Sequence, residues 1–332
     1  MTATRDNQPA VSAIFITPDD FETTRRTVVA WSKQTIASRV EAIIVAPSAA
    51  ALREDKQLLS AFHSLQVLEH GPARSTSAMR VQGIRAARAP FVAITEDHCY
   101  PSRRLAELAL ARFAEGHDVV AAPFRNANPS LAMSWANLLI EYEPWVDPPR
   151  PGEPTHLPGH NGLYRRDVLL SYGEELESIF EAETVLQWDM MSRHGSTLAL
   201  LEGARMHHLN FSKVPASLWL RYLGGLLFGA NRSREWGWGK RLAYAAGSPL
   251  IPLVRFRRIA GAIRRVPPAS RVRGLRAIVL VALAFDALGE MTGYLGAPSG
   301  KAMELLTGIE FKRERFMADR IPPRLERALS HP

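Results

Sequence analysis

Three residues that can bind a metal ion or move a proton stand together at positions 96–98. Residues 91–94 form an apolar run typical of a buried strand, and Glu96, Asp97 and His98 follow after one residue. Carboxylate oxygens and imidazole nitrogens bind divalent cations, and a cation here would neutralise a diphosphate leaving group. The alternative is that Asp97 caps a helix beginning near Pro101 while its two neighbours are solvated. The three residues alone leave both interpretations open.

The segments around these residues alternate between strand and helix patterns. The strand patterns are 11–17, 40–46, 65–69, 91–95 and 118–122, and the helix patterns are 19–34, 49–62, 75–88 and 101–115. This alternation predicts an α/β fold with a mostly parallel, Rossmann-like sheet flanked by helices. Pro101 suits the first turn of a helix. Ligands of such sheets bind at the carboxyl ends of the strands, where residues 96–98 are expected.

The distribution of glycine excludes several nucleotide-binding classes. No glycine precedes Gly71, so neither a G-x-G-x-x-G turn nor a phosphate-binding P-loop can follow the first strand. The sequence therefore disfavours dinucleotide-binding Rossmann enzymes, P-loop NTPases and sugar nucleotidyltransferases. If the domain binds a nucleotide, other groups must neutralise its phosphates.

The order of motifs between residues 11 and 211 resembles the family-2-type glycosyltransferases of the GT-A fold. The matching segments are VSAIFITPDD (11–20), MRVQGI (79–84), AITEDHCYP (93–101), LPGHNGLYRRDVL (157–169), EAETVLQWDMMSRHG (181–195) and ARMHHLN (204–210). The resemblance implies a GT-A-like catalytic domain over residues 1–211. It also implies inverting transfer of a hexose-like sugar from a nucleoside-diphosphate-sugar to a hydroxyl acceptor, with Mn²⁺ or Mg²⁺ as cofactor.

The resemblance also assigns roles to individual residues. The implied metal ligands are Asp97, His98 and His208, with His207 as the rival of His208. The implied nucleotide contacts are Thr17, Pro18, Asp19, Arg80 and Glu96, and the implied sugar or acceptor contacts are Gly159, His160 and Asn161.

A general base is also needed, because the acceptor hydroxyl must lose its proton. Glu183, at the expected start of a helix, is the candidate, and Glu181 is the fallback. Asp189 lies six residues after Glu183, ~240° around an ideal helix, so these two cannot face one site. A helix-starting acid can also serve only the helix dipole, which is the competing interpretation of Glu183.

Two departures from the family pattern affect these roles. The second strand ends in IIVAPSAA, where the family usually has Asp-Asp-Gly-Ser, so no carboxylate is available there for the nucleoside. Thr184 stands where the family usually has its Asp base. These departures motivate the alternative of a non-catalytic nucleotide-sugar-binding or scaffold subunit of a polysaccharide assembly system.

The C-terminal region, residues 212–332, differs from the rest in charge. Residues 212–276 hold fourteen Lys and Arg and a single acid, Glu235, together with three tryptophans. The apolar run 277–285 is shorter than the ~20 residues that span a bilayer. We expect basic, amphipathic helices that bind an anionic membrane surface, with a lipid-linked or envelope-polysaccharide acceptor. The alternative is that they pack on the body or on a partner subunit. No nucleic-acid-binding motif occurs, so we expect no nucleic acid partner.

The expected location follows from two further features. Cys99 is the single cysteine, which excludes an internal disulfide framework and suits a reducing compartment. Residues 1–10 lack the layout of a signal peptide. We therefore expect a cytoplasmic protein, peripheral on the inner face of the cell membrane.

Overall fold

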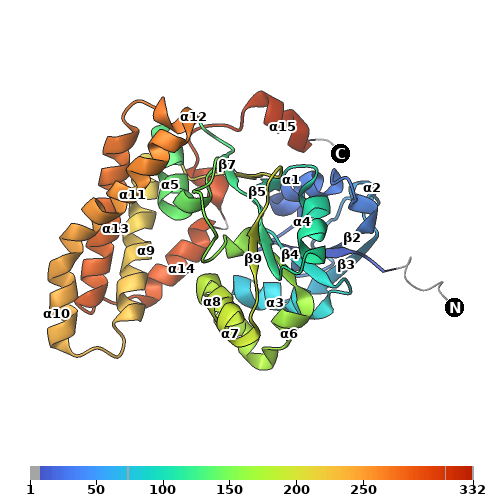
Figure 1. Cartoon of the computed structure of the whole chain (residues 1–332), viewed down its shortest axis with the longest axis horizontal. Coiled ribbons are helices and arrows are strands. Elements are labelled where there is room, and N and C mark those ends of the chain that lie inside the picture. Colours follow the sequence, from blue (N-terminus) through green and yellow to red (C-terminus); the bar gives the residue numbers. More distant parts are fainter. Residues whose placement is uncertain (1–7, 73–74, 311, 331–332) are drawn as a thin grey trace. The chain divides into compact units, whose positions relative to one another are not determined.

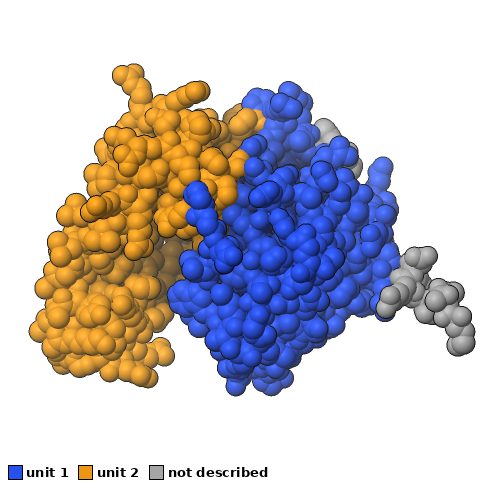
Figure 2. Space-filling model, in the orientation of Figure 1, with its two compact units in different colours: residues 1–125, 151–208, 323–332 blue, residues 126–150, 209–322 orange. Residues whose placement is uncertain are grey.

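The chain forms two compact units, which Figure 2 shows in different colours. The computed structural model describes residues 8–72, 75–310 and 312–330. Unit 1 consists of the described residues of 1–125, 151–208 and 323–332, and unit 2 of 126–150 and 209–322. The second segment of unit 2 begins at Leu209, three residues before the predicted start of the C-terminal region at residue 212. The predicted domain boundary stays a prediction. Residues 1–10 were predicted not to form a signal peptide, and residues 1–7 of this segment lie outside the described residues.

Unit 1 is built on a seven-stranded sheet, which confirms the predicted mostly parallel α/β fold (Figure 1). Its strands are β1 (Val11–Ile16), β2 (Val40–Ala46), β3 (Ser64–Glu69), β4 (Phe91–Ile94), β6 (Val119–Ala121), β8 (Leu163–Arg165) and β9 (Leu198–Leu200). They lie in the order β3-β2-β1-β4-β8-β6-β9. Only β8 runs antiparallel to its neighbours, β4 and β6. Every residue of β2 is buried, as expected for a sheet covered on both faces.

The strand order creates the place where a ligand is expected. The chain adds β2 and β3 on one side of β1 and then β4 on the other, so the order reverses at the β1–β4 pair. Ligands of open α/β sheets bind outside the carboxyl ends of strands at such reversals. The predicted residue Thr17 follows β1 directly, and the predicted residue Glu96 lies two residues after the end of β4.

The helices of unit 1 agree with most of the predicted ones. They are α1 (Phe21–Ser32), α2 (Lys56–Leu59), α3 (Thr76–Ala86), α4 (Leu105–Ala114), α6 (Arg166–Leu170), α7 (Leu176–Phe180), α8 (Glu183–His194) and α15 (Pro323–Ser330). The helix predicted over 49–62 is wrong for most of its length, because Arg53 adopts a left-handed φ of 53° and Asp55 caps a new, four-residue helix. Late in the chain, α15 packs on α1, where Arg26 pairs with Glu326 at 3.1 Å.

The predicted helix start at Pro101 is also wrong. Residues Cys99–Pro101 form β5, which pairs antiparallel with β10 (Met206–His208); β7 (Phe124–Asn126) completes this three-stranded sheet. The next helix, α4, begins at Leu105 without a side-chain cap. The interpretation that Asp97 caps a helix near Pro101 is therefore wrong as well.

Unit 2 is helical. Its helices are α5 (Ala132–Tyr142), α9 (Val214–Arg232), α10 (Trp238–Gly247), α11 (Ile251–Arg265), α12 (Pro267–Ser270), α13 (Leu275–Tyr294) and α14 (Gly300–Glu310). Helices α9 and α13 cross in backbone contact: a Cβ on Gly225 would lie 2.1 Å from the Asp286 carbonyl oxygen, and one on Gly289 would lie 2.1 Å from that of Tyr222. Within the described ranges, no helix has both the length and the apolarity to cross a membrane.

Candidate functional site

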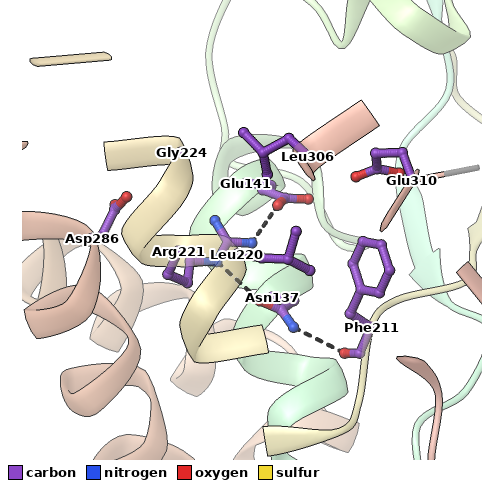
Figure 3. Close-up of a pocket in the computed structure, with 9 residues that line it drawn as sticks. All are labelled: Asn137, Glu141, Phe211, Leu220, Arg221, Gly224, Asp286, Leu306 and Glu310. Atoms are coloured by element: carbon purple, nitrogen blue, oxygen red, sulfur yellow. Dashed lines mark hydrogen bonds and ion pairs between the residues drawn. The ribbon is translucent and has the colours of Figure 1, made fainter. Parts of the chain in front are cut away.

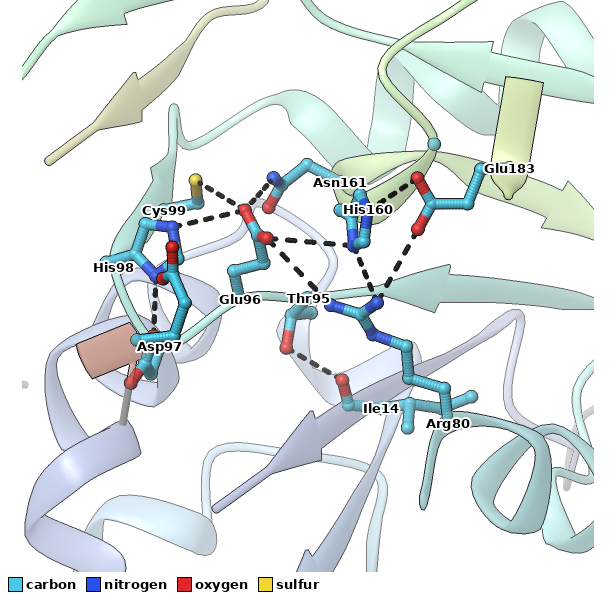
Figure 4. A network of polar contacts seen from close by, with 12 residues as sticks. Ile14, Arg80, Thr95, Glu96, Asp97, His98, Cys99, His160, Asn161 and Glu183 are labelled. Atoms are coloured by element: carbon cyan, nitrogen blue, oxygen red, sulfur yellow. Dashed lines mark hydrogen bonds and ion pairs between the residues drawn. The ribbon is translucent and has the colours of Figure 1, made fainter. Parts of the chain in front are cut away.

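The carboxyl ends of β1 and β4 are tied together beside Glu96 (Figure 4). The Thr95 hydroxyl donates to the backbone oxygen of Ile14 at 2.7 Å, which fixes the point where the chain leaves the sheet. Asn161 donates from Nδ2 to Glu96 Oε2 at 2.7 Å. Glu96 is thereby held between the sheet and the 3-10 turn Gly159–Asn161.

Arg80, on α3, is a buried cation between two carboxylates. Its Nη1 lies 2.6 Å from His160 Nδ1 and 3.5 Å from Glu183 Oε1, and its Nη2 lies 3.9 Å from Glu96 Oε1. Only 4% of the Arg80 side chain is exposed. A guanidinium offers several donors in one rigid plane, so a single residue can hold both carboxylates in position. The predicted residues Arg80, Glu96, His160 and Glu183 therefore lie in one network.

His160 orients the carboxylate of Glu183. The distance between His160 Nε2 and Glu183 Oε2 is 2.7 Å. Since Nδ1 accepts from Arg80, we assign the ring proton to Nε2, which donates to Glu183. The close approach needs glycine at position 159, because a Cβ there would lie 2.4 Å from Glu183 Cβ. Glu183 is the first residue of α8, as predicted.

The electrostatics of the site favour an ionised Glu96. Burial alone would raise the pKa of this carboxyl. The nearby imidazoles of His98, His160 and His208 outweigh burial and hold the pKa of Glu96 well below its usual value. The carboxyl is therefore ionised at neutral pH and can accept hydrogen bonds.

A second group of donors adjoins this network. One ligand atom from each of Glu96, His98, Cys99 and His208 lies within 4.8 Å of the other three. Glu96 Oε2 is 3.3 Å from His98 Nε2 and 3.4 Å from Cys99 Sγ. The two histidine rings meet edge to face, with centroids 4.9 Å apart. His98, Cys99 and His208 are buried, so the structure brings together a compact set of potential metal ligands.

Asp97 lies beside this group without belonging to it. Its Oδ1 lies 2.6 Å from His98 Nδ1, whereas the other ring nitrogen of His98, Nε2, faces Glu96. Its predicted role as principal metal ligand stays a prediction. Cys99, by contrast, was not predicted as a ligand, although it directly follows His98 in the sequence.

The remaining predicted residues lie at the end of β1 or on neighbouring elements. The Thr17 hydroxyl donates to the Asp20 backbone oxygen at 2.6 Å, and Asp19 accepts from Thr23 at 2.6 Å, so both shape the start of α1. The nucleotide-binding roles of Thr17, Pro18 and Asp19 stay predictions. Asp189 accepts from the Tyr172 hydroxyl at 2.6 Å and does not join the network.

A separate pocket of about 140 Å³ lies within unit 2 (Figure 3). Arg221 lines it and donates to Glu141 and, at 3.0 Å, to Asn137. Asn137 in turn donates to the Phe211 backbone oxygen at 2.9 Å. The charge of Arg221 is thus satisfied within the pocket wall, and none of the predicted site residues lines this pocket.

Comparisons with known proteins identify similar solved structures but no family. No family model matches the chain, and no curated protein matches it. A mannosyltransferase from Pyrobaculum calidifontis in complex with GDP-Man and Mn²⁺ is 13% identical, with 84% of this chain and 87% of that chain covered and a TM-score of 0.48. S. aureus TarS 1-349 in complex with UDP is also 13% identical, with 86% and 90% covered and a TM-score of 0.45. Likeness at this level assigns no activity, and the function proposed below rests on the residues of unit 1.

Proposed function

We propose that the chain is an inverting glycosyltransferase that moves a sugar from a nucleoside-diphosphate-sugar to a hydroxyl acceptor. The observation that carries this proposal is the network of Arg80, Glu96, His160 and Glu183 at the β1–β4 reversal. It provides a carboxylate base, a buried cation and an adjoining group of metal ligands where ligands of such sheets bind. These are the elements that transfer from a diphosphate requires in a fold without a glycine-rich phosphate loop.

In the proposed reaction, Glu183 is the general base. The acceptor hydroxyl attacks the anomeric carbon and forms the new C–O bond, while the bond to the diphosphate breaks and the nucleoside diphosphate leaves with the electron pair. Glu183 takes the hydroxyl proton. His160 and Arg80 fix the orientation of the carboxylate before the acceptor arrives. The competing interpretation of Glu183 as a helix-starting acid does not account for these two partners.

The residues present fit some divalent cations better than others. Glu96, His98, Cys99 and His208 offer oxygen, nitrogen and sulfur, whereas Mg²⁺ prefers oxygen ligands alone. A divalent cation at this group would supply positive charge to the diphosphate. The predicted Mg²⁺ is thus a poorer fit than a transition metal.

One observation favours a second candidate, a non-catalytic nucleotide-sugar-binding or scaffold subunit. Both oxygens of Glu183 face donors in the structure, Arg80 and His160, and the side chain is 8% exposed. A carboxylate held in this way also serves as a structural link between α3 and α8. The two candidates predict different results: the transferase turns over a nucleotide-sugar, whereas the non-catalytic subunit only binds it.

We further propose that unit 2 binds an anionic membrane surface, with a lipid-linked or envelope-polysaccharide acceptor. On α11, Leu253 and Val254 are 64% and 57% exposed, and the exposed Arg257 and Arg258 follow one turn later on the same face. On α10, Trp238 is 63% exposed. Exposed apolar residues next to cations fit the interface of an anionic bilayer. The location that we propose is the inner face of the cell membrane.

The transfer proposal is tested by calorimetric titration of UDP, GDP and dTDP, with and without Mn²⁺, followed by turnover of the matching nucleotide-sugar. We expect one diphosphate to bind, and donor hydrolysis or transfer to be lost in Glu183→Gln. Binding without turnover in the wild type, with a range of hydroxyl acceptors, would support the scaffold candidate. No binding of any diphosphate would exclude both.

A further inference from the structure

The group formed by Glu96, His98, Cys99 and His208 has an unusual composition for a metal site that would serve a diphosphate. It contains one carboxylate, two imidazoles and one thiol. Hard cations such as Mg²⁺ select oxygen ligands, whereas thiolates and imidazoles select softer transition metals. The composition of the group therefore carries information about which ion it binds.

Strand pairing brings the sulfur into this group. Cys99 on β5 lies directly opposite His208 on β10, in the antiparallel register that also pairs His207 with Tyr100. Side chains directly opposite on neighbouring strands lie close together on the same face. Successive residues of a strand point to opposite faces, so His207 points away from the face that His208 shares with Cys99. The backbone thus determines which of the two adjacent histidines joins Cys99.

Asp97 orients one of the ligands. Because its Oδ1 lies 2.6 Å from His98 Nδ1, that nitrogen carries a ring proton, and Nε2 is the nitrogen left to bind a metal ion. Nε2 is the nitrogen that lies 3.3 Å from Glu96 Oε2, within the group. Metal-bound histidines commonly donate their second nitrogen to a carboxylate, which fixes the tautomer and strengthens the ligand. Asp97 occupies the position of such a partner.

We infer that Glu96, His98, Cys99 and His208 form a site for a borderline-soft divalent ion of the Zn²⁺ class, in which Cys99 binds as thiolate and Asp97 orients His98. The Cys99 thiol releases its proton to solvent when the ion binds. Four ligands of this kind match the tetrahedral preference of zinc. The catalytic meaning of the site rests on the proposed transfer reaction, whereas its metal preference rests on the donor set alone.

Glu96 connects the ion to the transfer network. Its side chain is 14% exposed, compared with 9% for His98, and its Oε1 faces Arg80 at 3.9 Å and His160 at 3.8 Å. Its Oε2 faces His98 and Cys99. One carboxylate therefore contacts both groups, through one oxygen each.

The test is a titration of the metal-free full chain with Co²⁺, which reports its ligands in the visible and near-ultraviolet spectrum. Since the chain has a single cysteine, a sulfur-to-cobalt charge-transfer band can come only from Cys99. We expect that band in the wild type, its displacement by Zn²⁺, and its loss in Cys99→Ser. Absence of the band in the wild type would overturn the inference.

Variants separate the ligands from their neighbours. We expect Cys99→Ser to weaken Zn²⁺ binding about 100-fold or more while changing Mn²⁺ binding less than about 10-fold. His208→Gln should also weaken Zn²⁺ binding, whereas the matched control His207→Gln should not. Asp97→Ala should weaken Zn²⁺ binding about 10- to 100-fold but keep the sulfur band, as expected for an orienting residue. Equal losses of Zn²⁺ and Mn²⁺ affinity in Cys99→Ser would contradict a thiolate ligand.

A final arm separates this inference from the proposed function. UDP, GDP or dTDP is added to the Co²⁺-loaded protein, and the visible spectrum is compared with turnover. A sulfur band without turnover would leave the site standing and remove the transferase. Turnover with Mn²⁺ and no sulfur band would leave the transferase standing and remove the zinc-class site.

Discussion

At the scale of single residues, the site depends on one cation shared by several partners. Arg80 contacts His160, Glu183 and Glu96 and is almost fully buried. Removing one partner of a buried ion pair leaves an uncompensated charge, which costs about 3–5 kcal/mol. Substitutions in this network therefore need a conservative form, so that a loss of activity is not a loss of folding.

Glu183→Gln is the most informative of these substitutions. The amide keeps the size of the side chain and can still accept from His160, but it cannot take a proton. We expect the turnover number to fall about 10²- to 10⁴-fold while nucleotide binding persists. Glu181→Gln is the matched control, because Glu181 lies two residues earlier, is exposed and is outside the network. Equal loss in both variants would contradict Glu183 as the base.

Much of the network can be predicted from residue types and order. Arg80, Glu96, His160, Asn161 and Glu183 were all predicted as site residues, and the structure brings them together. Residue types alone do not predict which of these side chains contact one another. The partners of Arg80 lie 80 and 103 residues away in the sequence, so its contacts depend on how the chain folds.

At the scale of elements, one misassigned segment explains the missed ligand. Pro101 favours a helix start by its fixed φ, but here it ends the short strand β5. A three-residue strand has too little periodicity to be distinguished from a loop in the sequence. Without β5 and its register with β10, nothing in the sequence places Cys99 opposite His208. The long, buried strands β1 and β2 were predicted correctly because each contains an unbroken apolar run, residues 13–16 in β1 and 42–46 in β2.

The sheet contains a buried carboxylate whose charge makes stability depend on pH. Glu41, on β2, is fully buried, and burial alone would raise its pKa. Donors from Ser12, Gln66 and Arg88 outweigh burial and lower the pKa of Glu41 below its usual value. The pKa of Glu41 in the folded protein lies below its value of 4.5 in the unfolded chain, so the ionised carboxylate stabilises the fold above pH 4.5. This stabilisation is lost as the pH falls through the pKa of the folded state.

Glu41→Gln should therefore remove part of this pH dependence. We expect the free energy of unfolding to fall by about 1–3 kcal/mol at pH 7, and the gap to the wild type to narrow as the pH falls below about 4.5. Denaturant unfolding at a series of pH values measures both effects. Glu69→Gln, at the exposed end of β3, is the control and should follow the wild type. A constant gap at all pH values would contradict the ionised form of Glu41.

The crossing of α9 and α13 gives a prediction for unit 2. Gly225→Ala places a methyl group 2.1 Å from the Asp286 carbonyl oxygen, so the helices must separate, and we expect a loss of about 3 kcal/mol or more. The neighbouring Gly224 has no atom within 4 Å of an added Cβ. Gly224→Ala should therefore stabilise α9 by about 0.5–1 kcal/mol through helix propensity alone. Thermal unfolding of both variants checks the opposite signs.

At the scale of the whole molecule, charge is distributed unevenly along the chain. Fourteen Lys and Arg against one acid lie in residues 212–276, all within unit 2. Exposed apolar residues accompany them on α10 and α11. Composition predicted this region, but only the fold shows which side chains are exposed, because the 3.6-residue period divides each helix between a packed and a free face.

Membrane binding is tested by flotation with vesicles of phosphatidylcholine alone or mixed with phosphatidylglycerol. We expect binding only to the anionic vesicles and release at high salt. Arg257→Glu with Arg258→Glu should weaken binding about tenfold or more, since each cation near the surface contributes about 1 kcal/mol. Arg324→Glu with Arg327→Glu, the same charge change on exposed residues of α15 in unit 1, is the control. Indifference to anionic lipid would contradict the membrane proposal.

The packing of α15 on α1 has a consequence for how the protein is made. Arg26 and its partner Glu326 are 300 residues apart, and all of unit 2 is synthesised between them. Closing so long a loop costs roughly 5 kcal/mol of chain entropy, and only after translation has passed α15 can the contact form. Until α15 is synthesised, the surface of α1 that packs against α15 stays exposed to solvent. Unit 1 therefore begins to fold first and finishes last, because its final helix is made only after all of unit 2.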